Sequence, residues 1–253
     1  LPTAQILQVL QQLCSALEYM HGRGYAHRDI KPHNILLHKP PSLPSASSSG
    51  ASQPPGCDNS GHGQIAITIK GGGGVTAAEE SQPLISPSQP SVTMPQGGKS
   101  GHGHGQGHSR QQGWRVVVMD FGSARQRQVV VGSRAEALAV QEDAEANCTA
   151  PYRAPELYDC PSPAVLDLAA ADVWSLGATA YALMYGDSPF QIQANQQGAS
   201  MALAVMNAVV PFPKDPAHAY PEPLQQLVRQ CLVHDPAARP TAAQLGAAVA
   251  GLV

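Results

Sequence analysis

The stretch that most constrains this chain is the eight residues His27–Asn34, which lie between a helical pattern and a short apolar run. Before them, Thr3–His21 carries apolar residues at helical spacing, and Gly22 follows where such a helix would end. After them comes Ile35–Leu37, which is typical of a short buried strand. A loop fixed between a helix and a strand can hold side chains in a set geometry, so His27–Asn34 is a candidate functional site.

Three side chains of this loop form a chemically specific set. Asp29 supplies a carboxylate, Lys31 a cation and Asn34 a carboxamide, all within six residues. Phosphoryl transfer needs a carboxylate to receive a hydroxyl proton, a cation to offset phosphoryl charge, and oxygen ligands for a metal ion. The alternative is a surface turn, in which Asp and Asn are also common. The match to H-R-D-x-x-x-x-N is complete at every fixed position.

Further signatures follow in a fixed order along the chain. They are Asp120–Gly122 after a β-branched run, Ala154–Glu156, Asp172–Gly177, and Asp235–Pro236 with Arg239–Pro240. With the loop, these motifs resemble the large, helical lobe of a eukaryotic protein kinase. The resemblance implies a mainly α fold, with at most two short antiparallel strand pairs near the catalytic loop.

Helical patterns elsewhere agree with that fold. Asp172–Tyr185 is apolar nearly all round and is predicted to be the most buried element. Shorter helices are predicted over Met201–Val209 and Pro223–Val233. Thr241–Gln244 reads as a capping box that opens a last helix.

The resemblance assigns roles to the site residues. It implies that Asp29 accepts the proton of the substrate hydroxyl and that Lys31 contacts the γ-phosphate. A lysine at this position of the motif resembles the serine/threonine class of kinases. It implies that Asn34 and Asp120 each hold a Mg²⁺ ion bound to ATP, since hard cations prefer oxygen ligands. Leu36 would form part of the floor of the adenine pocket.

The same resemblance implies regulatory and structural roles. Arg28 would bind a phosphate on the activation segment, with Ser133 and Thr149 as candidates for modification. For Thr149 we favour contact with the catalytic Asp and Lys instead. Glu156 and Arg239 would form a buried ion pair, and Asp172 would accept hydrogen bonds from the catalytic-loop backbone.

The small lobe of a kinase is expected to be absent from this chain. A Gly-rich loop, a strand Lys and a helix Glu normally precede the catalytic loop. Only 26 residues precede His27, and they read as one helix. We therefore expect the isolated fragment to be inactive.

Residues 39–113 interrupt the expected kinase domain, which otherwise covers 1–253. This stretch is rich in Ser, Pro, Gly and Gln, so we expect a disordered, low-complexity insertion. Within it, Gln64–Lys70 alternates and is compatible with a short strand. The net charge of −3 gives no reason to expect a nucleic-acid partner.

The long segment 132–157, with Cys148–Leu157 at its end, resembles the Numb-associated kinase family. Its lipid-modified subfamily is constitutively active and is attached to Golgi or other membranes through N-terminal acyl groups. Those acylation sites would lie outside this chain, so we expect a cytoplasmic protein whose membrane association depends on other residues. The alternative to an active kinase is a pseudokinase that only binds partners. Intact Asp29, Asn34 and Asp120 argue against it.

Overall fold

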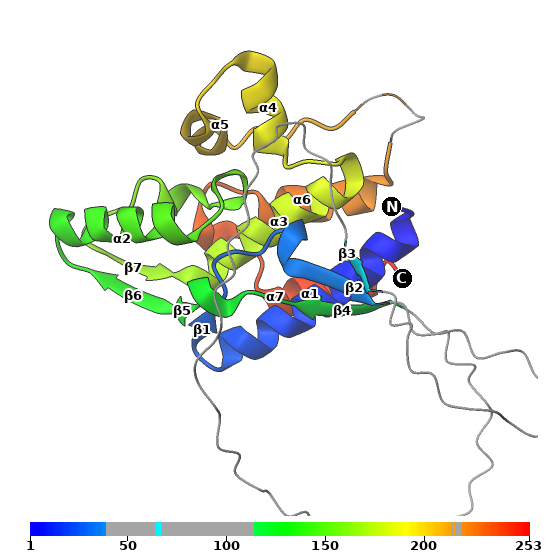
Figure 1. The fold of residues 1–253 in the computed structure, drawn as a ribbon, viewed down its shortest axis with the longest axis horizontal. Helices are drawn as coiled ribbons and strands as arrows, with labels where there is room; N and C mark the ends of the chain where they lie inside the picture. The colour runs from blue at the N-terminus through cyan, green and yellow to red at the C-terminus, as the bar shows by residue number, and fades with distance from the viewer. Residues whose placement is uncertain (39–63, 67–113, 214, 216–218) are drawn as a thin grey trace, which may run out of the picture. The chain divides into compact units, whose positions relative to one another are not determined.

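The most buried element is helix α3, Leu168–Tyr185, at the centre of the computed structural model (Figure 1). All but two of its residues are buried. Its start is capped by the Asp167 side chain, which accepts a hydrogen bond from Ala169 N, and it ends at Gly186 with φ 95°. The helix predicted over 172–185 is confirmed as the most buried element. It begins four residues earlier than expected because Asp167 caps it there.

Three helices pack around this centre. Helix α1 (Thr3–Gly22) lies against α3 and α7 (Ala242–Ala250), while α6 (Glu222–Cys231) packs on α3. Close approach of α6 requires a glycine at Gly177, where a Cβ atom would lie 2.5 Å from the Cβ of Cys231. The helices predicted at both ends of the chain are confirmed, with bounds that shift by one or two residues.

Side-chain caps set the starts of three further helices, α7, α5 (Met201–Asn207) and α4 (Pro189–Gln197). The capping box predicted at Thr241 is present, with Gln244 bonding back to the cap residue. Helix α5 is two residues shorter than predicted. Helix α4 was not predicted. Its apolar positions are few and its start depends on the Ser188 side chain.

A small antiparallel sheet follows the catalytic loop. Strand β2 (Ile35–His38) pairs with β4 (Arg115–Val118), with Ile35 opposite Val118. On its other edge β2 pairs with β3 (Gln64–Ala66). The strand predicted over Gln64–Lys70 is thus present at Gln64–Ala66, and residues 67–70 lie outside the described residues.

Two further pairs of antiparallel strands involve residues 125–131, which follow Asp120–Gly122. Strand β1 (Tyr25–Ala26) pairs with β5 (Arg125–Gln126), and β6 (Gln128–Val131) pairs with β7 (Ala164–Asp167). The expectation of at most two strand pairs near the catalytic loop is therefore wrong. The β6–β7 pair joins segments more than thirty residues apart, which a local pattern does not reveal.

Between β6 and β7 the chain forms helix α2, Arg134–Asn147, which was not predicted. Its sequence is rich in Ala and charged residues, and only Ala137 and Ala144 are buried. Such a weak apolar stripe is a poor signal for a helix. Ser133, considered above for modification, caps it by accepting from Glu136 N at 3.3 Å.

The structure describes residues 1–38, 64–66, 114–213, 215 and 219–253. The prediction that residues 39–113 are disordered therefore lies outside the described residues, apart from β3. No helix within the described ranges has the length and apolar character needed to cross a bilayer.

Candidate active site

Two side chains of the core helix hold the catalytic loop His27–Asn34: the carboxylate of Asp172, and Thr179, whose Oγ1 donates to Ile30 O at 3.2 Å. Asp172 in α3 is fully buried and accepts hydrogen bonds from His27 N at 2.8 Å and Arg28 N at 2.6 Å. His21 Nε2 lies 2.8 Å from the same carboxylate. Arg28 has φ 71°, a left-handed conformation that is unfavourable for a residue with a side chain. The bonds to Asp172 offset this strain and orient the loop.

Four donors converge on the Asp29 carboxylate. Oδ1 accepts from Thr149 N at 3.0 Å and from Thr149 Oγ1 at 2.7 Å. Oδ2 accepts from Lys31 Nζ at 2.7 Å and from Asn34 Nδ2 at 3.0 Å. Lys31 Nζ also donates to Thr149 Oγ1 at 2.7 Å, which closes the network. Residues 120 positions apart in the chain thus form one hydrogen-bonded cluster.

The electrostatics of this cluster keep Asp29 ionised. Burial by itself would raise the pKa of the Asp29 carboxyl. The hydrogen bonds from Lys31 and Thr149, together with the charge of Lys31, outweigh burial, and the pKa lies below its ordinary value. The group is therefore an acceptor at neutral pH.

Asn34 and Asp120 lie at neighbouring strand ends. Asn34 directly precedes β2, and its backbone carbonyl accepts a hydrogen bond from Met119 N at 2.9 Å. Asp120 is the residue after Met119, so Asn34 and Asp120 are held close to each other. The Asn34 amide nitrogen donates to Asp29, which leaves its oxygen without a partner among the described residues. Asp120 is exposed, has φ 61°, and within the described ranges accepts a hydrogen bond from Gly122 N alone, at 3.3 Å. These oxygens fit the donor chemistry of Mg²⁺.

Arg28 has a protein carboxylate as its partner. Its Nη2 lies 2.5 Å from Asp143 Oδ2 in α2, and its Nη1 donates to Ser123 O at 3.4 Å. Asp143 is held in turn by Asn147 Nδ2 at 2.9 Å, and Asn147 O accepts from Ser123 Oγ at 2.6 Å. The position expected to receive a phosphate is occupied by Asp143. Sequence reasoning missed this residue.

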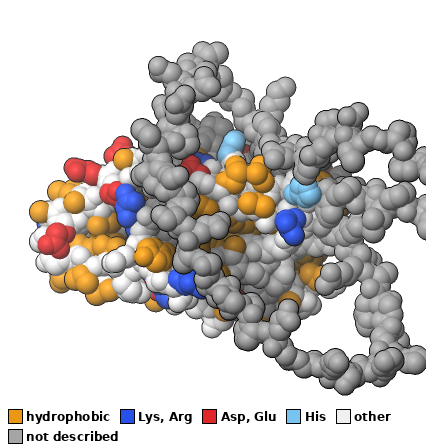
Figure 2. All heavy atoms as spheres, turned by 60° about the horizontal axis from the view of Figure 1, so that its bottom comes forward, with side chains coloured by type: hydrophobic (Ala, Val, Ile, Leu, Met, Phe, Trp, Pro, Cys, Tyr) orange, Lys and Arg blue, Asp and Glu red, His pale blue; other side chains and the backbone are white. Residues whose placement is uncertain are grey.

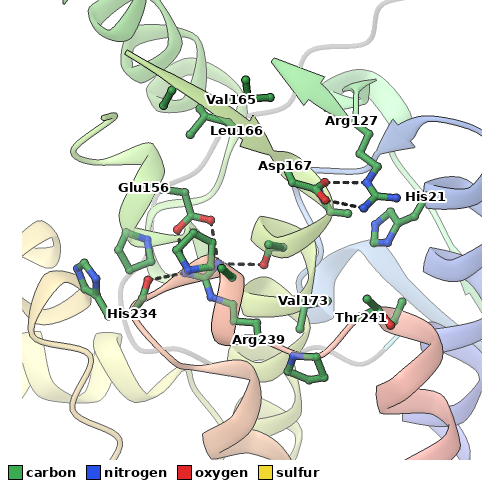
Figure 3. A pocket seen from close by; sticks show the side chains of 18 of the residues that line it. His21, Arg127, Glu156, Val165, Leu166, Asp167, Val173, His234, Arg239 and Thr241 are labelled. Carbon is green, nitrogen blue, oxygen red and sulfur yellow. Dashed lines mark hydrogen bonds and ion pairs between the residues drawn. The ribbon is translucent and has the colours of Figure 1, made fainter. Parts of the chain in front are cut away.

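The ion pair expected between Glu156 and Arg239 is present and buried. Two bonds of 2.8 Å join the guanidinium to the two carboxylate oxygens. The guanidinium also packs over the ring of Trp174, 4.9 Å from its centre. The pair fixes the Ala154–Glu156 motif to the residues just before the last helix, α7 (Figure 3).

Leu36, expected in the adenine pocket, is half-buried in β2 opposite Val117. Its neighbours Ile35 and Leu37 are buried on the other face of the strand. Leu36 therefore lies on the face of the sheet away from the helical core.

Comparison with known proteins agrees with these contacts. The chain matches the family described as Protein kinase domain over residues 1–43 and 108–248. It is 32% identical over 236 residues to serine/threonine-protein kinase 16 of Rattus norvegicus, covering 93% of this chain and 52% of that protein. It is 40% identical over 130 residues to serine/threonine-protein kinase ppk13 of Schizosaccharomyces pombe, covering 51% of this chain and 37% of that protein.

A third relative, serine/threonine-protein kinase ENV7 of Saccharomyces cerevisiae, is 36% identical over 129 residues, which are 51% of this chain and 35% of that protein. The chain spans about half the length of the first relative. The family match covers the loop His27–Asn34, Asp120–Glu156 and the helical core together. The chain therefore belongs to the protein kinase family.

Proposed function

We propose that this chain is the large lobe of a serine/threonine protein kinase, which transfers the γ-phosphate of ATP to hydroxyl groups of proteins. The observation that carries the proposal is the cluster formed by Asp29, Lys31, Asn34 and Thr149. It combines an ionised base, a cation and an amide that hydrogen-bond to one another, and the oxygen of that amide has no partner among the described residues. Phosphoryl transfer depends mainly on such positioning and charge stabilisation.

In the proposed reaction Asp29 orients the substrate. A Ser or Thr hydroxyl oxygen would attack the γ-phosphorus, the bond to the bridging β–γ oxygen would break, and ADP would leave. The hydroxyl proton would pass to Asp29. A carboxylate has about four acceptor positions, and four donors already occupy them. Entry of a hydroxyl therefore displaces one donor.

Lys31 is the donor best placed to move. Its side chain is 19% exposed and rotatable, whereas Thr149 N is fixed in the backbone and Asn34 is buried. Turning away from Asp29, the Lys31 ammonium would meet the γ-phosphate and offset its charge. Asn34 and Asp120 would hold Mg²⁺, which neutralises the phosphate oxygens when bound.

The remaining parts of this proposal concern the whole protein. A small lobe with a Gly-rich loop would complete the ATP site together with Leu36, and the isolated chain would be inactive without it. We place the protein among the lipid-modified Numb-associated kinases on the resemblance of residues 132–157. Cytoplasmic location, and Golgi or membrane attachment through acylation outside this chain, belong to the same proposal.

The test is transfer from labelled ATP to Ser/Thr peptides by the full-length protein. Asp29→Asn should lower kcat at least about a hundredfold, the size of a general-base contribution. Asp120→Ala should abolish the Mg²⁺-dependent signal. Glu142→Gln, which removes an exposed carboxylate in α2, is the matched control and should retain activity. Equal background for wild type and both site variants would favour the pseudokinase alternative.

A further inference from the structure

Strand β7 has one unpaired edge in the described part of the chain. Leu168 N donates to Arg127 O at 2.8 Å, while Arg127 N donates to Gly24 O at 2.8 Å, so Arg127 and Leu168 hold a hydrogen-bonded position next to the β6–β7 ladder through one bond. Hydrogen-bonded and non-hydrogen-bonded pairs alternate in an antiparallel ladder. Ala164 and Leu166 therefore bond toward β6, while the N–H and C=O of Val165 and the N–H of Asp167 point away from it; the C=O of Asp167, as the cap of α3, belongs to the first turn of that helix. No described residue pairs with this outer edge.

The outer face of the same ribbon is apolar and exposed. Val130 of β6 lies directly opposite Val165 of β7, and the two residues are 74% and 64% exposed. Figure 2 shows hydrophobic side chains on the surface at the end of the molecule formed by α2, β6 and β7. Exposed β-branched residues on a strand with a free edge are a template for another strand.

A cavity of about 790 Å³ adjoins this edge. All four residues of β7 line it and none of β6 does, so the cavity lies on the unpaired side. Its apolar lining includes Pro161, Ala169, Val173, Ala237 and Ala242. In Figure 3 Val165 and Leu166 lie on one side of the cavity, and Arg239 and Thr241 on the other. A volume of this size accommodates large side chains.

The charges around the cavity leave a negative excess. Arg127 Nε lies 2.7 Å from Asp167 Oδ1, and Arg239 is paired with Glu156, so these charges are matched within the protein. Glu18 and Asp159 also line the cavity and have no ion pair in the described ranges. A ligand that carries a cation would complement them.

We propose that the outer edge of β7 binds an extended segment of a partner protein, which adds a strand to the β6–β7 ribbon. Its backbone bonds to Val165 and Asp167, an aliphatic side chain enters the cavity, and a Lys or Arg lies near Glu18 or Asp159. In this mode of recognition the main chain gives affinity and alternate side chains give specificity. The site is separate from Asp29 and is independent of phosphoryl transfer.

The test is fluorescence polarisation of the whole chain with a labelled, acetylated and amidated peptide, KVTVTVK. We expect saturable binding, and binding about tenfold weaker for EVTVTVE because Glu18 and Asp159 repel it. A KVTVTVK peptide methylated at alternate backbone nitrogens keeps its side chains but cannot pair as a strand, and it should not bind. Equal binding of the methylated peptide would overturn the proposal without any change to the protein.

Matched protein variants place the site on β7. Val165→Pro removes the outward N–H and leaves the ladder to β6 intact, because proline is tolerated where the N–H faces away from the sheet. It should weaken binding about tenfold or more. Val130→Pro makes the same change on the other edge and should leave affinity within about twofold. Equal loss in both variants would refute the assignment to β7.

Two other occupants would also refute the proposal. If light scattering shows a dimer that Val165→Pro converts to monomer, the edge binds a second copy of this chain. If deletion of residues 39–113 is required before KVTVTVK binds, the edge is covered by the chain's own segment.

Discussion

Replacing Arg239 by lysine measures how much stability one guanidinium provides. Arg239 uses all five of its N–H groups: two bond to Glu156, and the others bond to the carbonyls of Val233, Ala170 and His234 at 2.8 to 3.0 Å. Lysine has three donors, so at least two acceptors lose their partner. At about 1.5 kcal/mol for each hydrogen bond to a charged group, the loss is about 3 kcal/mol.

Thermal unfolding followed by fluorescence measures this loss. For a domain of this size 1 kcal/mol corresponds to about 2–4 °C, so the melting temperature should fall by about 6–12 °C. Arg229→Lys is the control. Arg229 bonds to Glu222 at 2.6 Å, but both side chains are more than a third exposed, and we expect a fall of less than about 3 °C. Similar falls for the two variants would show that burial and bond number do not explain the role of Arg239.

Other predictions follow from the site and the cysteines. In the full-length protein, Asp143→Asn should lower kcat/KM about tenfold by releasing Arg28, and phosphatase treatment of wild type should change nothing; Glu142→Gln is the control. Because the pKa of Asp29 is lowered, its contacts stabilise the fold above about pH 4 and are lost as pH falls through the lowered pKa. Asp29→Asn should flatten the urea stability profile in that range. Burial raises the pKa of Cys14 to about 12, so mass spectrometry should find Cys14 alkylated by iodoacetamide at pH 8 only after unfolding.

Local sequence patterns were sufficient to predict features that depend on a single helix or loop. The buried helix α3, the capping box at Thr241 and the loop with Asp29 and Asn34 could be recognised because period, cap and motif lie within a few residues. The observed start of α3 differs from the predicted one by four residues, because the Asp167 side chain caps the helix before the predicted apolar pattern begins.

Long-range contacts were the part that sequence reasoning missed. Val130 has no local signal that it will pair with Val165, and the Ala-rich helix α2 has only a weak apolar stripe. Asp143 lies 115 residues from Arg28, so its role as the partner of that guanidinium depends on α2 being present and correctly placed. The expectation of a phosphate at Arg28 followed from the motif alone, without the helix that supplies a carboxylate.

The pairing of β2 with β4 places the site residues Asn34 and Asp120 at one end of the strand pair and the chain that connects the two strands at the other end. Ile35 and Val118 lie at the catalytic end of the hairpin, while His38 and Arg115 lie about 10 Å away at the other end, where residues 39–114 depart. A change in chain length between the two strands that leaves β3 and its pairing with β2 intact can therefore preserve the spacing between Asn34 and Asp120. The same junction offers a place to graft an affinity tag or a fluorescent reporter into the protein.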